Sequence, residues 1–363
     1  MKSIFNNLKY FHIIRGLAAL VVVVFHAKFV LWVGGAVYKH DHGLHNVGDY
    51  FLFALDTLSS CGEQCVIIFF ILSAFVIRHS FDKYRNNLVE FYKLRLLRIY
   101  IPFLFSVAFS IVVLIACIFW INPAIYVSDF RQYNTRLSDA FYQLSISQVF
   151  NTVFLTTQWK EYTGANYAYW SLGHELIFYI FFPLYNLLSR NKKVLLAGVL
   201  IILYLLTYWR IFYFQLYFIS GLLMYDYFAS KSLHPFFKNK WIYLILLAGM
   251  YIGINIITSR VSGLYADFAT LIFCLFLFDY IFYFMKIKNI WLMKLGDISY
   301  TLYLNHLPLL MFFYAVITLG AGKLVFYSRL PYYAGVIFAV LFSIPLYYLI
   351  EKPSIRLLKK IRR

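Results

Sequence analysis

Long apolar runs alternate with short polar or basic segments along almost the whole of this sequence. Ten of the runs are about 20 residues long, which is the length that an α-helix needs to cross the hydrocarbon core of a bilayer. The pattern therefore predicts an all-α, polytopic integral membrane protein with about ten transmembrane helices. The predicted spans are residues 11–33, 60–78, 99–121, 170–188, 193–209, 211–229, 241–257, 264–284, 296–319 and 331–350.

The basic residues indicate on which side of the membrane each connecting segment lies. If the N-terminus is cytoplasmic and the spans alternate, the cytoplasmic segments hold 24 of the 33 Lys and Arg residues, as the retention of basic loops in the cytoplasm requires. We therefore expect both termini in the cytoplasm and two long outer segments, 34–59 and 122–169. The predicted cytoplasmic segments are 1–15, 78–98, 190–193, 230–240, 285–295 and 351–363.

Composition excludes the soluble classes of protein. Hydrophobic residues make up 63% of the chain and charged residues only 13%, whereas a soluble domain has about 25% charged residues. The net charge of +18 would suggest a nucleic-acid partner in a soluble protein. Here the cytoplasmic loops account for it, so we expect membrane lipids around the protein and no nucleic acid. No repeat, linker or fused soluble domain is visible, and we predict a single membrane domain over residues 1–363.

The first span carries two ionisable residues, which are costly inside a membrane and usually functional there. Arg15 and His26 are eleven residues apart, so on an α-helix they share one face and lie about 16.5 Å apart along the axis. A histidine can serve as a general base because its unperturbed pKa is near 6.5. Either residue alone is better explained by helix packing or by topology, but the shared face favours a functional pair.

Other ionisable residues near the ends of spans are also candidates for binding or catalysis. Arg95 and Arg98 have an i,i+3 spacing that places both on one helix face. Guanidinium groups bind phosphate through paired hydrogen bonds, although retention in the cytoplasm also explains this pair. Glu175, beside His174, is suited to orienting a histidine, to holding an acceptor hydroxyl, or to helix capping. His306 in the ninth span is, taken alone, best explained as a packing or hydrogen-bonding residue.

A histidine-rich segment raises the question of a metal site. The segment KHDHGLH at 39–45, with Cys61 and Cys65 further along the chain, matches no spacing of a known structural zinc site. We therefore expect no metal. The chain also lacks a phosphate-binding loop, a dinucleotide-binding glycine pattern and a nucleophile elbow. It is not expected to be ATP-driven, flavin-dependent or a hydrolase.

Six fragments occur in an order that is typical of one family. The first is Arg15 with His26, the second is FFILSAFVI at 69–77, and the third is Arg95 and Arg98 with Tyr100 and Pro102. The fourth consists of Trp170, Ser171, Leu172, Glu175, Phe178, Tyr179 and Pro183. The fifth consists of Gly296, Ser299, Tyr300, Tyr303, Leu304, His306 and Pro308, and the sixth is Glu351 with Pro353. With these fragments the chain resembles, over almost its whole length, the membrane acyltransferase 3 family. Its members are bacterial acyl-CoA-dependent enzymes that decorate surface polysaccharides and related acceptors.

Two departures from the family pattern lie in the second span. Ile67 stands where the family usually has an acidic residue, with Glu63 one turn earlier, and Ala74 replaces the glycine after Ser73. Many family members also carry a fused extracytoplasmic domain, for which we expect no counterpart here.

The resemblance implies an enzyme, an O-acyltransferase of the cell inner membrane. It would move an acyl group, most simply acetyl, from cytoplasmic acyl-CoA (acetyl-CoA) to a hydroxyl of a lipid-linked or exported cell-surface glycan. His26 would act as the general base or carry the acyl group, with Glu175 as a partner of that histidine or of the acceptor. The expected donor-binding residues are Arg15, Arg95 and Arg98, and further candidates are Ser73, Trp170, Tyr303 and His306.

Two other classes of function are compatible with a polytopic chain. A glycan or lipid transporter (a flippase) of a polysaccharide export system would favour discontinuous helices in two matched halves, and the sequence shows no such internal symmetry. A non-enzymatic scaffold of an export complex would leave the Arg15–His26 register and the arginine pair unexplained.

Overall fold

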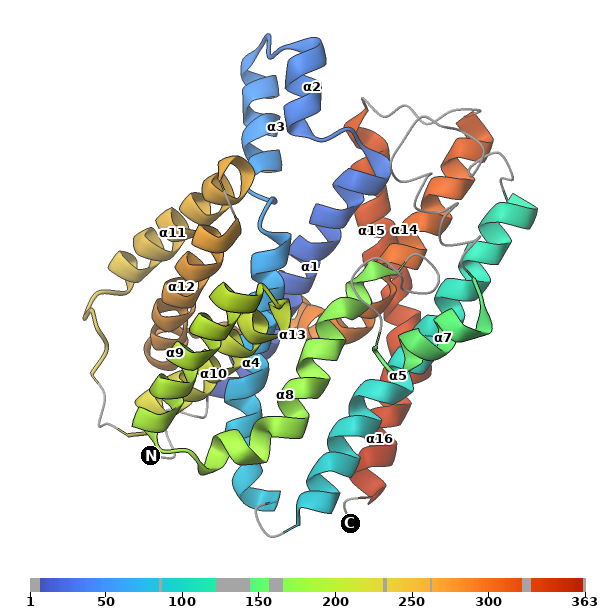
Figure 1. Cartoon of the computed structure of the whole chain (residues 1–363). Coiled ribbons are helices and arrows are strands. Elements are labelled where there is room, and N and C mark those ends of the chain that lie inside the picture. Colours follow the sequence, from blue (N-terminus) through green and yellow to red (C-terminus); the bar gives the residue numbers. More distant parts are fainter. Residues whose placement is uncertain are drawn as a thin grey trace. The chain divides into compact units, whose positions relative to one another are not determined.

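The computed structural model describes residues 7–84, 87–121, 144–156, 166–230, 234–261, 263–321 and 328–361. Within these ranges the regular elements are all helices, and no strand occurs among them (Figure 1). The predicted all-α, polytopic membrane fold is therefore confirmed.

Each of the ten predicted spans coincides with a long helix. The apolar runs predict these helices well because length and hydropathy decide whether a segment can span a bilayer. The ten helices are α1 (Lys9–Leu31), α4 (Gly62–Phe81), α5 (Leu88–Ala116), α8 (Trp170–Leu187), α9 (Arg190–Thr207), α10 (Arg210–Ala229), α11 (Lys240–Arg260), α12 (Gly263–Tyr283), α14 (Ser299–Ala321) and α15 (Arg329–Leu346).

Seven helical stretches in the described part of the chain are long and apolar enough to cross a membrane. The helices α8, α9 and α10 are not among these seven. The count of ten spans and the cytoplasmic position of both termini therefore stay predictions. Residues 122–143 and 157–165, which form much of the second predicted outer segment, lie outside the described residues.

Some helices extend beyond or lie between the predicted spans. α5 already begins at Leu88, because the Leu, Lys and Arg residues before the span are good helix formers. α15 continues through a π turn, η7 (Tyr347–Glu351), into the basic helix α16 (Lys352–Ile361). The remaining short helices are α2 (Gly35–His42), α3 (Val47–Thr57), η2 (Asp82–Tyr84), η3 (Cys117–Ile121), α7 (Ile146–Val153), η6 (Tyr167–Tyr169) and α13 (Ile290–Asp297).

Contacts between helices divide the chain into two compact units. Unit 1 comprises Met1–Ala18, Thr57–Tyr92 and His174–Asp297. Unit 2 comprises Ala19–Asp56, Lys93–Gly173 and Ile298–Arg363. Four of the five boundaries fall within α1, α3, α5 and α8, so each of these helices contributes to both units, and the fifth lies between α13 and α14.

Unit 1 is built on the close packing of α4 against α10. Gly221 of α10 permits this approach, because a Cβ atom there would lie 2.5 Å from the carbonyl oxygen of Ile71. α9 and α12 also contact α10, and α11 pairs with α12. The buried carboxylate of Asp267 accepts hydrogen bonds from Gln64 and Tyr213. One polar group thereby joins α4, α10 and α12.

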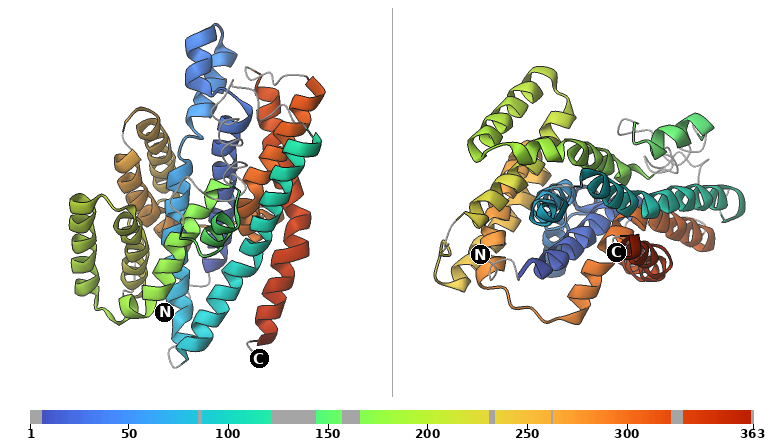
Figure 2. Two further views of the ribbon diagram at one scale, coloured as in Figure 1. Left: turned by 45° about the vertical axis from the view of Figure 1, so that its right-hand side comes forward. Right: turned by 90° about the horizontal axis from the view of Figure 1, so that it is seen from below.

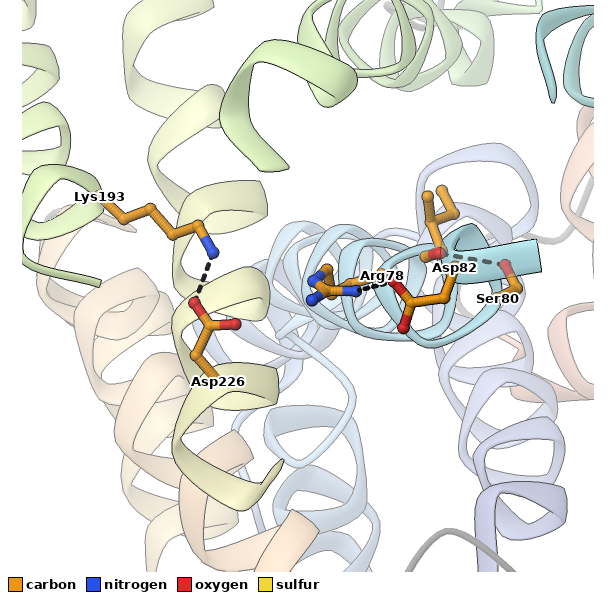
Figure 3. A network of polar contacts seen from close by, with 6 residues as sticks. Arg78, Ser80, Asp82, Lys193 and Asp226 are labelled. Carbon is orange, nitrogen blue, oxygen red and sulfur yellow. Dashed lines mark hydrogen bonds and ion pairs between the residues drawn. The ribbon is translucent and has the colours of Figure 1, made fainter. Parts of the chain in front are cut away.

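Ion pairs join further elements of unit 1, as Figure 3 shows. The buried Lys193 of α9 pairs with Asp226 of α10. Arg78 at the end of α4 pairs with Asp82 at 3.1 Å. Two basic residues of the predicted cytoplasmic segments therefore also stabilise the packing of unit 1.

Unit 2 is organised around α14, which pairs with α15 and also contacts η3 and η6. The α2–α3 hairpin lies at the end of this unit opposite to α16 (Figures 1 and 2). Arg329, at the start of α15, packs on the rings of Trp32 and Tyr38 and pairs with Asp56. These contacts attach the hairpin to the start of α15.

Candidate functional site

A proline inside α14 creates the polar centre of unit 2. Pro308 has no N–H group, so the carbonyl of Leu304, four residues earlier, has no partner within the helix. The hydroxyl of Ser106 and the amide nitrogen of Asn166 donate to this carbonyl instead, at 2.9 and 2.8 Å. α5 and the segment before η6 are thereby joined to the central turn of α14.

Buried polar side chains surround this turn. The Tyr169 hydroxyl lies between those of Ser106 and Ser110, at 2.8 and 3.0 Å. Asn166 also donates to Ser110 at 3.2 Å. All four side chains are fully buried, where a polar group without a partner would be costly. The cluster therefore fixes the relative positions of α5, η6 and α14.

Two positions of the family pattern meet next to this cluster. The Tyr303 and Ser171 hydroxyls are 2.8 Å apart, and the Tyr303 hydroxyl lies 3.0 Å from the carbonyl oxygen of Ala168. Both side chains are buried. Tyr303, a predicted candidate, thus joins α14 to the beginning of α8 and contacts the backbone through its hydroxyl.

Two histidines from distant parts of the sequence lie together in unit 2. The Nε2 atom of His306 is 2.9 Å from Nδ1 of His26, and the two rings stack with their centroids 4.9 Å apart. The Nδ1 atom of His306 is 2.7 Å from the carbonyl oxygen of Tyr303. The rings of Tyr167 and His26 pack in a T-shaped arrangement with their centroids 5.4 Å apart. His306 is fully buried, whereas His26 is half-buried.

When both histidines are neutral, their hydrogen-bond partners determine which ring nitrogen of each carries the proton. A carbonyl oxygen only accepts, so Nδ1 of His306 carries the proton and its Nε2 is an acceptor. Nδ1 of His26 must then donate to that Nε2. The lone pair of His26 is consequently on its own Nε2. This arrangement can take a proton at one defined atom, with His306 orienting the imidazole ring as the third member of a catalytic triad does.

The other predicted catalytic residue lies in unit 1. Glu175 of α8 accepts a hydrogen bond from the Tyr179 hydroxyl, one turn later in the same helix. It is more than one turn from the start of α8 at Trp170, so it does not cap this helix. The carboxylate is half-buried. Its role toward a histidine or an acceptor stays a prediction.

The predicted donor-binding arginines lie on the helices that their spacing requires. Arg15 and His26 occur on one uninterrupted helix, α1, with Arg15 in unit 1 and His26 in unit 2. Arg95 is half-buried and Arg98 is exposed, both in the first half of α5. They precede Ser106 by eleven and eight residues, or about 17 and 12 Å along the axis. In unit 2 the arginine pair is thus separated from the histidine turn by that length of helix.

The remaining candidates are placed as follows. Ser73 is a half-buried residue of α4 in unit 1, and Trp170 begins α8 within unit 2. In the histidine-rich segment, His45 contacts the carbonyl oxygen of His42. The described ranges contain no group of three or more His, Cys, Asp or Glu side chains arranged to hold a metal ion.

Sequence reasoning alone did not find the polar residues that support the histidine pair. Ser106 and Ser110 are i,i+4 serines within an apolar span, and Asn166 and Tyr167 precede a helix that the apolar runs predict only from Trp170. One signal was available, because Pro308 within a span requires outside donors for the Leu304 carbonyl.

Comparison with known protein families identifies the family of this chain. The model of the acyltransferase 3 family, described as an acyltransferase domain, matches residues 8–348. The histidine pair and the polar cluster around Leu304 fall within this range. No curated protein and no solved structure matches the chain.

Proposed function

This chain belongs to the acyltransferase 3 family, and from that premise we propose that it is an O-acyltransferase that uses acyl-CoA as its donor. The family membership makes the chain a membrane acyltransferase. Our proposal adds that the acceptor is a hydroxyl of a lipid-linked or exported cell-surface glycan, that the acyl group is acetyl and that the enzyme works in the inner membrane. The observation that supports it best is the His26–His306 pair.

The pair suits a transfer from a thioester to a hydroxyl. In this scheme, Nε2 of His26 takes the proton of the acceptor hydroxyl while the oxygen attacks the thioester carbonyl. The carbon–sulfur bond then breaks, and the proton on His26 passes to the departing thiolate to give free CoA. His306 stabilises the transient imidazolium by accepting from Nδ1 of His26. The same geometry would also support His26 as a carrier of the acyl group.

The donor would enter beside the part of α5 that carries Arg95 and Arg98, in unit 2. Arg95 and Arg98 supply guanidinium groups there for the nucleotide phosphates. The pantetheine arm would then extend along α5 toward the histidine turn, about 12 to 17 Å further on. Arg15 is assigned to the same task by its register on α1.

Aromatic and polar side chains are our candidates for holding the acceptor. The Tyr167 ring lies beside His26, and Trp170 follows three residues later. Aromatic rings suit the apolar faces of sugars, and Glu175 is our candidate for holding the acceptor hydroxyl. Membership in an acyltransferase family supports this function and not the alternative of a transporter.

Transfer of a labelled acyl group tests the proposal. The purified protein in lipid nanodiscs is supplied with ¹⁴C-acetyl-CoA and a panel of monosaccharides and lipid-linked saccharides, and acetylated product and free CoA are measured. We expect equal amounts of both with the wild type. His26→Ala should lower the rate about 10²- to 10⁴-fold, while His12→Ala, an exposed histidine of the same helix, should not. Wild-type protein that transfers nothing from acetyl-, succinyl- or longer acyl-CoA would refute the proposal.

A further inference from the structure

The N-terminus of α14 is closed by a side chain from another helix. The geometry points to Glu351, in the π turn between α15 and α16, as a positioning residue that fixes the first turn of α14 and through it the histidine pair. This inference rests on the proposed role of that pair in acyl transfer. Neither the resemblance nor the family match assigns a task to Glu351, which lies beyond the matched residues.

Glu351 satisfies backbone and side-chain donors of the first turn. Its Oε2 accepts from the backbone N–H of Thr301 at 3.1 Å and from the Thr301 hydroxyl. The first four N–H groups of an α-helix have no partner within the helix, and Thr301 belongs to this group because α14 begins at Ser299. Thr301 is buried, so its N–H would otherwise be left without a partner away from water.

The local sequence offers no substitute for this contact at the residue before the helix. Position 298 is an isoleucine, whereas side chains that cap helices carry an oxygen acceptor. A carboxylate at this place also lies at the positive end of the helix dipole, which stabilises both partners. The charge of Glu351 and its two hydrogen bonds therefore both stabilise the first turn of α14.

Only a short stretch of helix separates the first turn of α14 from His306. Asn305 donates to the Thr301 carbonyl at 2.9 Å, and His306 is the next residue. The Tyr303 carbonyl, two residues after Thr301, contacts Nδ1 of His306. From Thr301 to His306 the helix rises only about 7.5 Å. A rotation or fraying of the first turn would thus be passed directly to the 2.9 Å contact between the histidines.

Other contacts hold Glu351 and the first turn in place. The hydroxyl of Ser354, a buried residue of α16, donates to the Glu351 carbonyl at 2.8 Å. Tyr300 donates to the Ile99 carbonyl of α5 at 3.1 Å. α5, α14 and the α15–α16 connection therefore meet at this turn. π turns are rare and occur frequently at functional sites, and this one places Glu351 where it caps α14.

Two measurements on the full-length protein test this role. The first is amide hydrogen exchange over residues 299–306, which reports the cap without any need for activity. The second is the steady-state kinetics of transfer from acetyl-CoA to the best acceptor of the panel described above. The variants are Glu351→Ala, Glu351→Gln, which keeps an acceptor oxygen but not the charge, and Thr301→Val, which removes only the hydroxyl donor. The matched control is Glu90→Ala, which removes a carboxylate that pairs with Asn87 at the start of α5.

A positioning role predicts a specific pattern. The amide exchange rates over residues 299–306 should rise at least tenfold in Glu351→Ala and rise less in Glu351→Gln. The rise in Thr301→Val should lie between those of the two Glu351 variants. The kcat should fall about 10- to 100-fold in Glu351→Ala, since a displacement of about 1 Å costs rate on that scale, while the KM for acetyl-CoA changes less than twofold. Glu90→Ala should change neither quantity.

Other patterns would overturn the inference. Unchanged exchange in the Glu351 variants would show that the carboxylate does not cap α14, whatever happens to the rate. Faster exchange with an unchanged kcat would show that the first turn does not position the histidines. If Glu351→Ala fails to fold, the same criteria apply to Glu351→Gln and Thr301→Val. If the wild type transfers no acyl group, the proposed function fails and the exchange data still decide whether Glu351 is the cap.

Discussion

At the scale of single residues, the two histidines of unit 2 differ because their surroundings differ. Both ring nitrogens of the fully buried His306 have partners, the Tyr303 carbonyl and His26. His26 is half-buried, and its second nitrogen carries the lone pair. The fully buried histidine is suited to orienting a partner, and the more accessible one to accepting a substrate proton. We therefore propose separate tasks for the two residues of the pair.

The arginine pair on α5 allows donor binding to be separated from topology. Lysine keeps the positive charge that retains a loop in the cytoplasm, but it cannot form the paired hydrogen bonds of a guanidinium group with phosphate. Arg95→Lys with Arg98→Lys should therefore leave membrane insertion intact and weaken acetyl-CoA binding about tenfold, because hydrogen bonds to charged groups contribute about 1.5–3 kcal/mol each and lysine replaces only part of this.

The dissociation constants of acetyl-CoA and of acetyl-pantetheine, which lacks the nucleotide, provide the measurement for this variant. The loss should be confined to acetyl-CoA. Arg356→Lys, a change on the exposed side of α16, serves as the control. Equal acetyl-CoA affinities of the wild type and the double-lysine protein would mean that the two arginines act only in topology.

At the scale of helices, the sequence predicts much of the fold but little of the site. Hydropathy and length report on each segment separately, and they locate α1, α5 and α14 to within a few residues except where α5 begins at Leu88. Register on one helix is also readable, as for Arg15 and His26. The contact between His26 and His306 joins residues 280 positions apart. The residue spacing within one helix does not show which helices pack together, so this contact is known only from the structure.

Pro308 offers a test of how α14 is held. Pro308→Ala restores an N–H that competes for the Leu304 carbonyl, so Ser106 and Asn166 would lose a buried acceptor. We expect turnover to fall about tenfold through displacement of His306, and the protein to lose about 1–3 kcal/mol of stability from the donors left without a partner. Turnover and denaturant unfolding of the variant are the measurements.

The same variant has an internal control. Ser106→Ala removes one of the competing donors, so combining it with Pro308→Ala should add little to the loss caused by Pro308→Ala alone. Strictly additive losses in stability and turnover would show that the proline does not act through the Leu304 carbonyl.

At the scale of the whole molecule, topology decides from which side each substrate arrives. Twenty-four of the 33 basic residues lie in segments that we predict to be cytoplasmic, and the basic helix α16 ends the described chain. A reporter that is active only in the cytoplasm should therefore function when fused after Arg363, and one that is active only outside should function when inserted between α2 and α3. Extracytoplasmic activity at the C-terminus would contradict the predicted topology and the entry route of the donor.

The central claim is that His26 and His306 act as one catalytic unit. It is tested most directly by a double-mutant cycle of acetyl-transfer rates with His26→Ala, His306→Leu and the double variant, each shown to be folded by its thermal unfolding. Residues that act together are strongly non-additive. We predict that each single change lowers kcat at least about 100-fold and that the double variant is no slower than His26→Ala alone. Losses that multiply in the double variant, or a His26→Ala protein that turns over like the wild type, would contradict the claim.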